Sequence, residues 1–358
     1  MTIVSWWLGY ILLHSARIPY AAESHFVRLQ LWGACSLEEC TLATSAHDVT
    51  SLAQFARAQR SLKGNPDRSS PTMELIDSHA HLHFPAFSAD GAEVLQRARD
   101  NGISLITVGT KFATSASGID FAEQHDGVWC TIGLHPGHVH DHNFVDENEE
   151  TLSKPTPEKE FDSERYESLV RHPKVVAIGE FGLDYSRIPE GMDIEVFKND
   201  QRNVARQQLQ FATKHHKPVV IHCRGGTTAD VTGAHDDMRS LIVEEIARGG
   251  IERRGVIHCF TGTIDDAAKY ADLGFLISIT GIVTFGKSVA SAVKEIPLAQ
   301  MMIETDCPYL SPVPLRGKRN EPANVALIAQ AIADLKGIVL SEVAKVTSAN
   351  ARTLFRLP

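Results

Sequence analysis

Between residues 76 and 82 the chain reads Ile76-Asp77-Ser78-His79-Ala80-His81-Leu82, an apolar start that leads into a polar cluster. Because successive side chains of a β-strand point to opposite faces, Asp77, His79 and His81 would share one face. Two neutral imidazoles on one face can bind a single divalent cation. A His-x-His pair alone is weak support for a metal site, so the prediction depends on matching ligands elsewhere in the chain.

The composition is that of an ordinary globular protein. The chain has 358 residues, a formal net charge of −9, 43% hydrophobic residues and 22% charged residues, which fits one large domain with an extension or two smaller domains. The acidic balance argues against a surface covered by nucleic acid. It does not exclude a nucleic acid bound in a local cleft where metal ions supply positive charge. The six cysteines show no disulfide spacing, so we expect reduced thiols and a cytoplasmic protein.

The N-terminal segment, residues 1–72, shows no sustained apolar periodicity. Its apolar run Ile3–Leu13 is too short to span a bilayer, and no Lys or Arg precedes the run as in a signal peptide. We therefore expect residues 1–72 to be an extension, either poorly ordered or the product of an upstream start, rather than a signal or membrane anchor. The compact domain is predicted to span residues 73–358.

From Met73 onward, short β-rich apolar runs alternate with amphipathic segments. The predicted strands are Glu74–Asp77, Ile103–Val108, Val128–Ile132, Val175–Ile178, Pro218–Ile221, Gly255–Ile257, Phe275–Ile279 and Met301–Ile303. The predicted helices are Ala92–Asn101, Thr114–His125, Arg202–His215, Asp236–Arg248, Ile264–Leu273, Ala290–Glu295, Ala323–Leu335 and Leu340–Phe355. This alternation predicts a (β/α)8 TIM barrel of the α/β class, with a doubly wound open sheet as the alternative.

One segment, His138–Glu167, interrupts the alternation with a long acidic stretch that contains two prolines. We interpret it as a loop inserted after the third strand. Its three histidines, His138, His140 and His142, are interpreted as an exposed run in this loop and not as a metal site.

Polar residues follow several of the apolar runs at matching places. In chain order they are His79 and His81, His135, Glu180 and Asp184, His222 and Arg224, His258, and Glu304 and Asp306. In a TIM barrel the carboxyl ends of all strands face one end, where active sites lie. These side chains are therefore expected to converge at the barrel mouth.

The motifs that carry these residues resemble those of TatD-type metal-dependent hydrolases, a branch of the amidohydrolase-like barrels. The resemblance covers roughly residues 73–358 and rests on Asp77-Ser-His79-Ala-His81, Gly133-Leu-His135-Pro136, Gly179-Glu180-Phe-Gly-Leu-Asp184-Tyr185, His222-Cys-Arg224, His258-Cys-Phe-Thr-Gly262, Glu304-Thr-Asp306 and Asn320-Glu321-Pro322. Two stretches depart from the family pattern, the acidic insertion and a longer Gly225–Gly233 segment. Both bear on substrate choice more than on chemistry.

The resemblance implies two divalent metal cations per chain. One would be held by His79, His81, Glu180 and Asp306, and the other by Glu180, His222 and His258, with Glu180 as the bridge. A water between the metals would then act as hydroxide, and Asp306 would orient it or take its proton, so Asp306 and Glu180 are the expected catalytic residues. Mixed imidazole and carboxylate ligands suit Zn²⁺ or Mn²⁺, whereas members of this family are often magnesium-dependent.

Further residues are expected around this centre. His135 and Arg224 would bind a substrate phosphate. Three carboxylates, Asp77, Asp184 and Glu304, would orient imidazoles or close loops. Two more sets complete the expectations: Cys223, Cys259 and Cys307 as packing residues, and Arg316, Lys318 and Arg319 as a basic patch that steers a polyanion to the mouth.

The resemblance favours a deoxyribonuclease that cleaves DNA phosphodiester bonds. One alternative is a metal-dependent hydrolase of an amide or ester outside nucleic acids. Glu180 argues against it, because many amidohydrolases carry a carboxylated lysine on that strand. A second alternative is a barrel that binds metal without catalysis. The sequence indicates DNA or another phosphodiester as the partner, with no membrane and no obligate protein partner.

Overall fold

The computed structural model describes residues 73–140, 146–149, 160–226 and 233–358. In this part of the chain a single parallel sheet runs in the order β1-β2-β3-β4-β5-β6-β7-β8. The strands are β1 Leu75–Ala80, β2 Ile103–Val108, β3 Val128–Ile132, β4 Val175–Asp184, β5 Val219–Arg224, β6 Gly255–Ile257, β7 Leu276–Ile279 and β8 Met301–Ile303. The helices are α3 Gly91–Asp100, α4 Phe112–Glu123, α5 Ser163–Val170, α6 Ile194–Lys214, α7 Ala234–Ala247, α8 Ile264–Asp272, α9 Lys287–Glu295, α10 Val325–Lys336 and α11 Leu340–Phe355.

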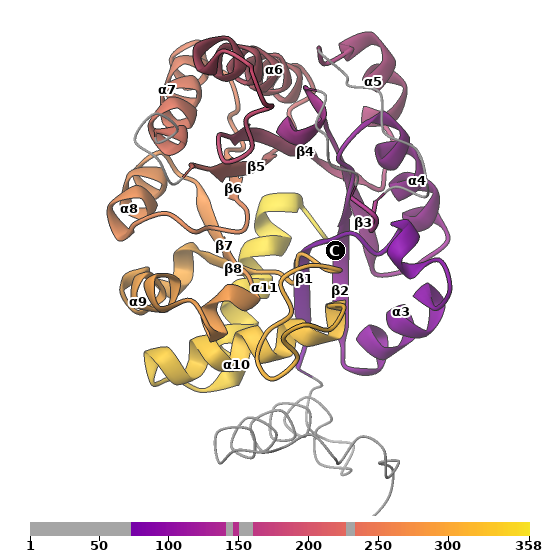
Figure 1. The fold of residues 1–358 in the computed structure, drawn as a ribbon. Helices are drawn as coiled ribbons and strands as arrows, with labels where there is room; N and C mark the ends of the chain where they lie inside the picture. The colour runs from indigo at the N-terminus through magenta and orange to yellow at the C-terminus, as the bar shows by residue number, and fades with distance from the viewer. Residues whose placement is uncertain (1–72, 141–145, 150–159, 227–232) are drawn as a thin grey trace, which may run out of the picture. The chain divides into compact units, whose positions relative to one another are not determined.

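The sheet closes on itself, as Figure 1 shows, with the strands at the centre and the helices in a ring around them. At the closing seam, Asp306 N donates to His79 O at 2.9 Å, and His81 N donates to Cys307 O at 2.8 Å. A sheet whose neighbours follow chain order and whose ends meet is a barrel and not a doubly wound open sheet. The TIM-barrel prediction is confirmed.

The local sequence explains why individual elements begin where they do. Helix α8 starts at a capping box, in which Asp266 N donates to Thr263 Oγ1 at 3.1 Å and Thr263 N donates to Asp266 Oδ2 at 3.0 Å. These reciprocal bonds satisfy amide groups that have no partner within the helix. All side chains of β1 and β4 are buried, as expected for parallel strands covered by helices.

Two buried layers hold the barrel together. The larger lies between the strands and the surrounding helices. The second fills the barrel interior near the strand starts and contains Ile76, Ile106, Val108, Val176, Ala177, Val220, Val256, Met302, Ala351, Phe355 and Leu357. Because Ile76 precedes His79 on β1, this apolar plug lies on the side of the polar cluster away from the mouth.

Three strands are longer than predicted. β1 continues to Ala80, β4 to Asp184 and β5 to Arg224, so His79, Glu180 and His222 lie within strands and not after them. The pairing is interrupted by register shifts, between Asp77 and Ala80 and between Ile178 and Phe181. Such irregularities re-aim side chains without ending a strand. An apolar run therefore ends earlier than the strand that contains it.

One glycine makes the close pairing of β4 and β5 feasible. Gly182 has φ +147°, and a Cβ at this position would lie 2.0 Å from His222 O. Only a residue without a side chain fits there. The consequence is that β4 and β5 run close together between Glu180 and Asp184, so both carboxylates face the histidine on β5.

The prediction of a loop over His138–Glu167 is wrong at both ends of this range. Helix α5 begins inside it at Ser163, where Arg165 N donates to the Asp162 carboxylate at 3.1 Å, an N-cap bond. His138 and His140 are not exposed, since only 12% and 11% of their side chains are accessible. The acidic composition suggested solvent, but both rings face carboxylates of the protein. His142, residues 1–72 and residues 227–232 of the longer segment after Arg224 lie outside the described residues.

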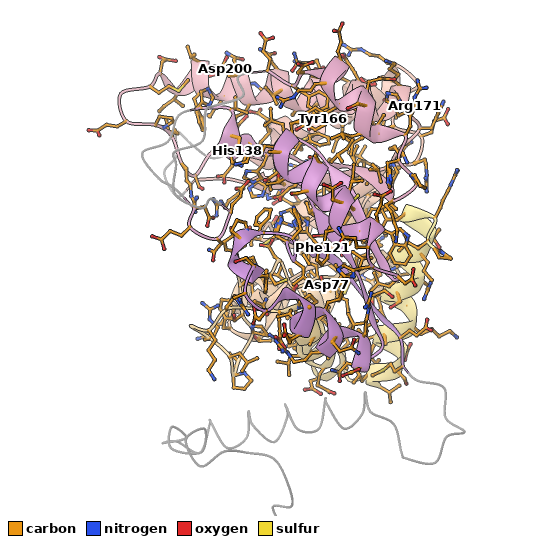
Figure 2. The ribbon with its side chains drawn as sticks, turned by 90° about the vertical axis from the view of Figure 1, so that its right-hand side faces the viewer. Asp77, Phe121, His138, Tyr166, Arg171 and Asp200 are labelled. Carbon is orange, nitrogen blue, oxygen red and sulfur yellow. The ribbon has the colours of Figure 1, made fainter. Side chains whose placement is uncertain are left out.

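Helix α6 also begins earlier than predicted. It starts at Ile194 rather than Arg202, because the Asp193 carboxylate accepts hydrogen bonds from Glu195 N and Val196 N at 2.9 and 3.0 Å. Figure 2 shows His138 toward the left of the barrel and Arg171 toward its right. Among the described helices no single one is long and apolar enough to cross a membrane, and one pair bent by 116° passes only on length and composition.

Candidate metal centre

A first group of ligand atoms forms where β1 meets the segment after β8. The Nε2 atoms of His79 and His81 lie 3.2 Å apart. Asp306 Oδ1 lies 3.4 Å from His81 Nε2 and 3.6 Å from His79 Nε2. Asp306 adopts φ +54°, a conformation uncommon for residues other than glycine. Its backbone bond to His79 O holds it there, so that its carboxylate faces the two imidazoles.

A second group forms on β4, β5 and the end of β6. Glu180 Oε1 lies 2.8 Å from His258 Nε2 and 2.9 Å from His222 Nδ1. The facing nitrogens of these two histidines are 3.3 Å apart. The other oxygen of Glu180, Oε2, lies 3.3 Å from His79 Nε2. One buried carboxylate therefore lies between the two groups of imidazoles.

The rings are oriented by bonds that point away from the cluster. In each case one ring N–H donates outward: His81 Nδ1 to Val108 O at 2.8 Å, His258 Nδ1 to Glu304 Oε1 at 3.2 Å, and His222 Nε2 to Asp184 Oδ2 at 3.3 Å. The opposite nitrogen of each neutral ring then carries a lone pair that faces the cluster. Metal-ligating histidines characteristically donate their second N–H to a carboxylate or carbonyl in this way.

This donor set fits divalent cations. Imidazole nitrogens and carboxylate oxygens approach one another within 2.8–3.6 Å, which is favourable only when positive charge lies between them, carried either by protons on the imidazoles or by a bound cation. Burial alone would raise the pKa of Glu180, but the imidazoles, His258 foremost, hold it well below its usual range. The pKa of Asp306 is likewise lowered by His81 against the effect of burial. The lowered pKa values keep both carboxylates ionised, which is the form that can bind a cation.

Two of the three outer carboxylates contact cluster imidazoles. Glu304 receives the His258 ring N–H and also Cys259 N at 2.6 Å. Asp184 lies between His222 and Arg224, whose Nη2 donates to Oδ2 at 2.6 Å. Although burial would raise the pKa of Asp184, the hydrogen bonds from His222 and Arg224 hold it well below its usual range.

The third outer carboxylate, Asp77, has a different position. It accepts hydrogen bonds from Thr305 N at 2.8 Å and Thr305 Oγ1 at 2.5 Å. Burial raises the pKa of Asp77 to about 8. Its bonds tie β1 to the segment that carries Asp306. Of the two roles that the sequence suggested for the outer carboxylates, the position of Asp77 therefore fits the closing of a loop and not the orientation of an imidazole.

His135 lies at the edge of the second group as a donor. Its Nδ1 accepts from Gly137 N at 2.9 Å, so Nε2 carries the proton and lies 3.4 Å from Glu180 Oε1. Burial lowers the pKa of His135 to about 3, which keeps the ring neutral. Although His135 lies within ligand distance of Glu180 and His222, a protonated nitrogen cannot bind a cation. We therefore assign it as a hydrogen-bond donor to the cavity.

The comparisons with known proteins agree with this geometry. A family model described as TatD related DNase matches residues 76–356. The chain belongs to the TatD family. Two relatives cover nearly all of this region: the uncharacterized metal-dependent hydrolase YabD of Bacillus subtilis, 35% identical over 79% of this chain and 99% of its own length, and a protein of Erwinia billingiae named 3'-5' ssDNA/RNA exonuclease TatD, 31% identical over 79% of this chain and 100% of its own length.

Solved structures give the same result. The crystal structure of the TatD homologue YjjV of Escherichia coli matches with a TM-score of 0.64 and 28% identity, over 80% of this chain and 99% of that one. A TatD family hydrolase of Entamoeba histolytica matches with a TM-score of 0.62 and 26% identity, over 80% of this chain and 99% of that one. The family resemblance predicted from the motifs is confirmed, and the chain is a metal-dependent hydrolase of the TatD family.

The mouth of this TatD barrel is a cavity of about 1030 Å³. Its lining includes the cluster residues His81, Glu180, His222, His258 and Asp306, together with His135 and Arg224. It also includes residues that the sequence did not single out as functional: Thr110, His138, His140, Asp146, Glu149, Arg187 and Tyr309. Several of these belong to the acidic insertion. The position of His138, three residues after His135, was the one sequence signal that could have indicated that the insertion lines the cavity.

The basic patch after β8 contacts the protein rather than the cavity. Arg319 donates to the Asp90 carboxylate at 2.5 Å and lies over the Phe87 ring. The Arg316 guanidinium lies 3.8 Å from the centre of the Phe285 ring. Neither these arginines nor Lys318 are among the cavity-lining residues. Their position gives no support to the prediction that they guide a polyanion into the mouth.

The cysteines next to the cluster are packing residues in their contacts. Cys223 and Cys307 are buried, Cys259 is partly buried, and all three thiols are free. Burial raises the pKa of Cys223 to about 12. A thiol kept protonated is a poor metal ligand, and each ligand group found among the described residues consists of histidines and carboxylates.

Proposed function

We propose that this chain is a two-metal-dependent deoxyribonuclease that hydrolyses the phosphodiester bonds of DNA. The observation that carries the proposal is the position of Glu180, whose two oxygens face separate imidazole groups at 2.8 Å and 3.3 Å. A pair of cations about 3.5–4 Å apart needs a bridging carboxylate of this kind. The nuclease assignment is supported by the family description and by the printed name of the Erwinia relative.

The metal ligands in this proposal are those expected from the sequence. His79, His81, Glu180 and Asp306 would hold one cation, and Glu180, His222 and His258 the other. Bound there, two divalent cations would lower the pKa of an attacking water and stabilise the charge that builds on the phosphoryl oxygens. The mixed nitrogen and oxygen donors favour Zn²⁺ or Mn²⁺, with Mg²⁺ as the alternative.

Asp306 is suited to accept the proton of the attacking water. Its side chain is 14% exposed, against 5% for Glu180, so of these two carboxylates it is the more open to the cavity. As the water oxygen forms its bond to phosphorus, Asp306 takes the proton, and the leaving sugar oxygen takes a proton from solvent water as the ester P–O bond breaks. A positioned base typically contributes about 10²–10⁴-fold to the rate.

His135 and Arg224 would orient the phosphate. The Nε2–H group of His135 points to the edge of the cluster, where it can donate to a phosphoryl oxygen. Arg224 directs Nε and Nη2 to Asp184, but its side chain is 41% exposed and lines the cavity. Its remaining N–H donors are available to a phosphate. The ion pair with Asp184 fixes the plane of the guanidinium and reduces the entropy lost on binding.

The charge of the mouth indicates that bound cations also serve substrate binding. The lining carboxylates are Asp146, Glu149, Glu180, Asp184, Glu190 and Asp306, whereas the lining arginines are Arg187 and Arg224. Without cations this excess of negative charge would repel a phosphodiester. A nucleic acid is therefore expected to bind only when metal is present.

The test is a substrate panel with single-stranded DNA, double-stranded DNA, RNA and simple carboxylic esters and amides, each with Mg²⁺, Mn²⁺ or Zn²⁺. We expect metal-dependent cleavage of DNA at a rate far above that of the esters and amides. If an ester or amide were the preferred substrate, the nuclease proposal would be replaced by the alternative hydrolase. If no bond were cleaved with any metal, the non-catalytic alternative would stand. A cytoplasmic location and the absence of a protein partner stay predictions.

A further inference from the structure

Three donors converge on one carboxylate in the wall of the mouth. Glu149 Oε1 accepts from Thr110 Oγ1 at 2.5 Å and from His138 Nε2 at 3.0 Å, and the Lys111 ammonium lies 3.6 Å away. The side chains of Lys111, His138 and Glu149 are 14%, 12% and 9% exposed. A hydroxyl, an imidazole and an ammonium group on one anion form the donor set of a phosphate-binding site.

Two of these donors, Thr110 and Lys111, belong to the barrel frame, whereas His138 begins the insertion that also carries the carboxylate. Thr110 and Lys111 follow β2, and Lys111 is the N-cap residue of α4, where the helix dipole favours an anion. His138 ends the short helix Pro136–His138 directly after His135. The ring centres of His135 and His138 are 6.4 Å apart. Thr110 and His138 therefore lie next to the candidate metal centre, in the wall of the same cavity, with Lys111 directly after Thr110.

We propose that Thr110, Lys111 and His138 form a phosphate subsite for the nucleic acid strand, and that Glu149 occupies this subsite as a carboxylate stand-in that competes with the substrate. The proposal rests on the proposed nuclease function, which it deepens by naming a second anion-binding position beside the scissile phosphate. A bound strand would replace the carboxylate by a phosphate of its own backbone.

Residues 146–149 are attached to the barrel by bonds other than those of the Glu149 carboxylate. Asp146 Oδ2 accepts from Tyr309 OH at 2.8 Å, and Asn148 O accepts from Ala86 N at 3.1 Å. These two anchors hold residues 146–149 independently of the side chain of Glu149. The carboxylate can therefore leave the subsite by side-chain rotation while the backbone remains in place.

Glu149 is an anion under all conditions in which such an enzyme works. Burial would raise its pKa, but His138, Thr110 and Lys111 lower it to about 2. A buried carboxylate with three donors is a close electrostatic match for one phosphate oxygen pair. Competition between the two anions is therefore a matter of affinity and not of protonation.

The main test is Glu149→Gln, measured by steady-state cleavage of short single-stranded DNA at saturating metal. Glutamine keeps the size of the side chain but removes the charge that competes with the phosphate. We expect KM to fall on the order of tenfold, as for one charge-assisted hydrogen bond, with kcat changed less than KM. An unchanged or higher KM would mean that Glu149 only fastens the insertion, and the subsite would be rejected.

Glu190→Gln is the charge-matched control. Glu190 lines the same cavity and is exposed, so this change removes one negative charge from the mouth without touching the three donors. We expect its KM to change much less than that of Glu149→Gln. Equal decreases in KM for both variants would show that general charge, and not a defined subsite, limits binding, and would overturn the proposal.

Lys111→Met tests the donors themselves. In the unaltered chain Lys111 is neutralised by Glu149, so we expect its loss alone to raise KM only slightly. In the Glu149→Gln background, where Lys111 would face the phosphate, the same change should cancel most of the gain. Additive effects in the double variant would contradict the subsite. Circular dichroism and metal content of each variant show whether the fold and the metal centre are retained.

Calorimetric titration of the metal-loaded full chain with inorganic phosphate separates this inference from the nuclease proposal. Phosphate binding at the metal centre is common to both chains, so the difference between the unaltered chain and Glu149→Gln reports the subsite alone. Tighter phosphate binding by the variant supports the subsite even if no DNA is cleaved, in which case only the proposed reaction fails. Equal binding overturns the subsite even if DNA is cleaved.

Discussion

The imidazole cluster and the insertion line the same cavity but are positioned in different ways. His79, Glu180 and His222 lie on paired strands, and their neighbours in the sheet fix the place of each Cα. Glu149 and Asp146 lie on a segment without strand or helix, held to the barrel by a few side-chain bonds and one backbone bond. The strands thus determine where the ligand atoms lie, and the loops determine what surrounds them.

This difference separates two kinds of requirement. A metal centre tolerates little displacement of its ligands, and strands supply that precision through their register. Substrate choice varies among proteins with one fold, and loops can change without disturbing the barrel. We therefore expect changes in the cluster to affect turnover and metal affinity, and changes in the insertion to affect substrate affinity.

The largest effect is expected for Asp306→Asn. Asparagine keeps the size and one ligating oxygen but removes the charge and the group that accepts the water proton. We expect turnover to fall by about 10²–10⁴-fold, the usual contribution of a positioned base. Substrate affinity should change much less, because the donors of His135 and Arg224 remain. Turnover and substrate affinity are measured together on DNA at saturating metal.

Circular dichroism of Asp306→Asn serves as the fold control, and His222 and His258 should still bind metal. Near-normal turnover would assign the preparation of the water to another group at the mouth. It would also weaken the contrast between the cluster and the insertion, since a residue of the cluster would then be no more important than a residue of the insertion.

The next effect is expected for Glu304→Gln. Glu304 accepts the His258 ring N–H and the amide of Cys259, so its charge fixes the orientation of a proposed ligand without facing the cavity. We expect metal affinity to fall about 10–100-fold, as for other residues that orient metal-binding histidines. KM for DNA at saturating metal should stay close to that of the unaltered chain.

Metal titration by calorimetry gives the affinity of Glu304→Gln, and Glu321→Gln provides a matched control at a partly exposed ion pair with Arg97. If both variants bound metal equally well, Glu304 would be a structural residue, and the link between outer carboxylates and ligand geometry would be lost.

Removal of metal should lower stability by a smaller amount. A cation that binds only the folded chain stabilises it by about 2.7 kcal/mol at a hundred times its Kd, which corresponds to roughly 4–5 °C in Tm for a domain of this size. Tm is measured after dialysis against a chelator and during stepwise return of metal. We expect the rise in Tm to end at about two ions per chain. A plateau at one ion would remove the bridging role proposed for Glu180.

The sequence was sufficient for the barrel and for most members of the cluster, for physical reasons. The apolar runs of parallel strands are nearly continuous, so β2, β3, β6 and β8 were predicted with their observed bounds. Ligands at strand ends recur at positions that a barrel brings together. The family resemblance then supplied their grouping around two cations.

The extent of other strands could not be predicted, because Glu180 and His222 are polar residues inside strands. Hydrophobicity identifies a strand only where its side chains face apolar neighbours, and here they face other polar groups. The prediction that the insertion is exposed was wrong for the opposite reason. Its acidic composition indicated solvent exposure, whereas Glu149 is buried against donors far from it in sequence, and a single sequence carries no signal for such pairing.

The smallest effect is expected for removal of residues 1–72. Every ligand and every anchor of the insertion lies after Met73, so a chain that begins there should fold and keep its full activity. The beginning of the described chain makes its own contacts with the C-terminal helix. Ser348 Oγ donates to Glu74 O at 3.3 Å, and Arg352 Nη2 lies 2.7 Å from Glu74 Oε2. A start at Met73 keeps both.

A chain that begins at Ser78 provides the contrasting control. It lacks Leu75, whose N–H donates to Gly102 O at 3.1 Å, and Asp77, which holds Thr305 beside β1. We expect this shorter chain to be insoluble or unfolded, because the barrel would lose half of β1 and the Asp77–Thr305 hydrogen bonds that support the closing seam. Circular dichroism, Tm and DNA cleavage are measured for both truncations. If the Met73 chain behaved like the Ser78 chain, residues 1–72 would be part of the folded domain, and the start assigned at Met73 would be wrong.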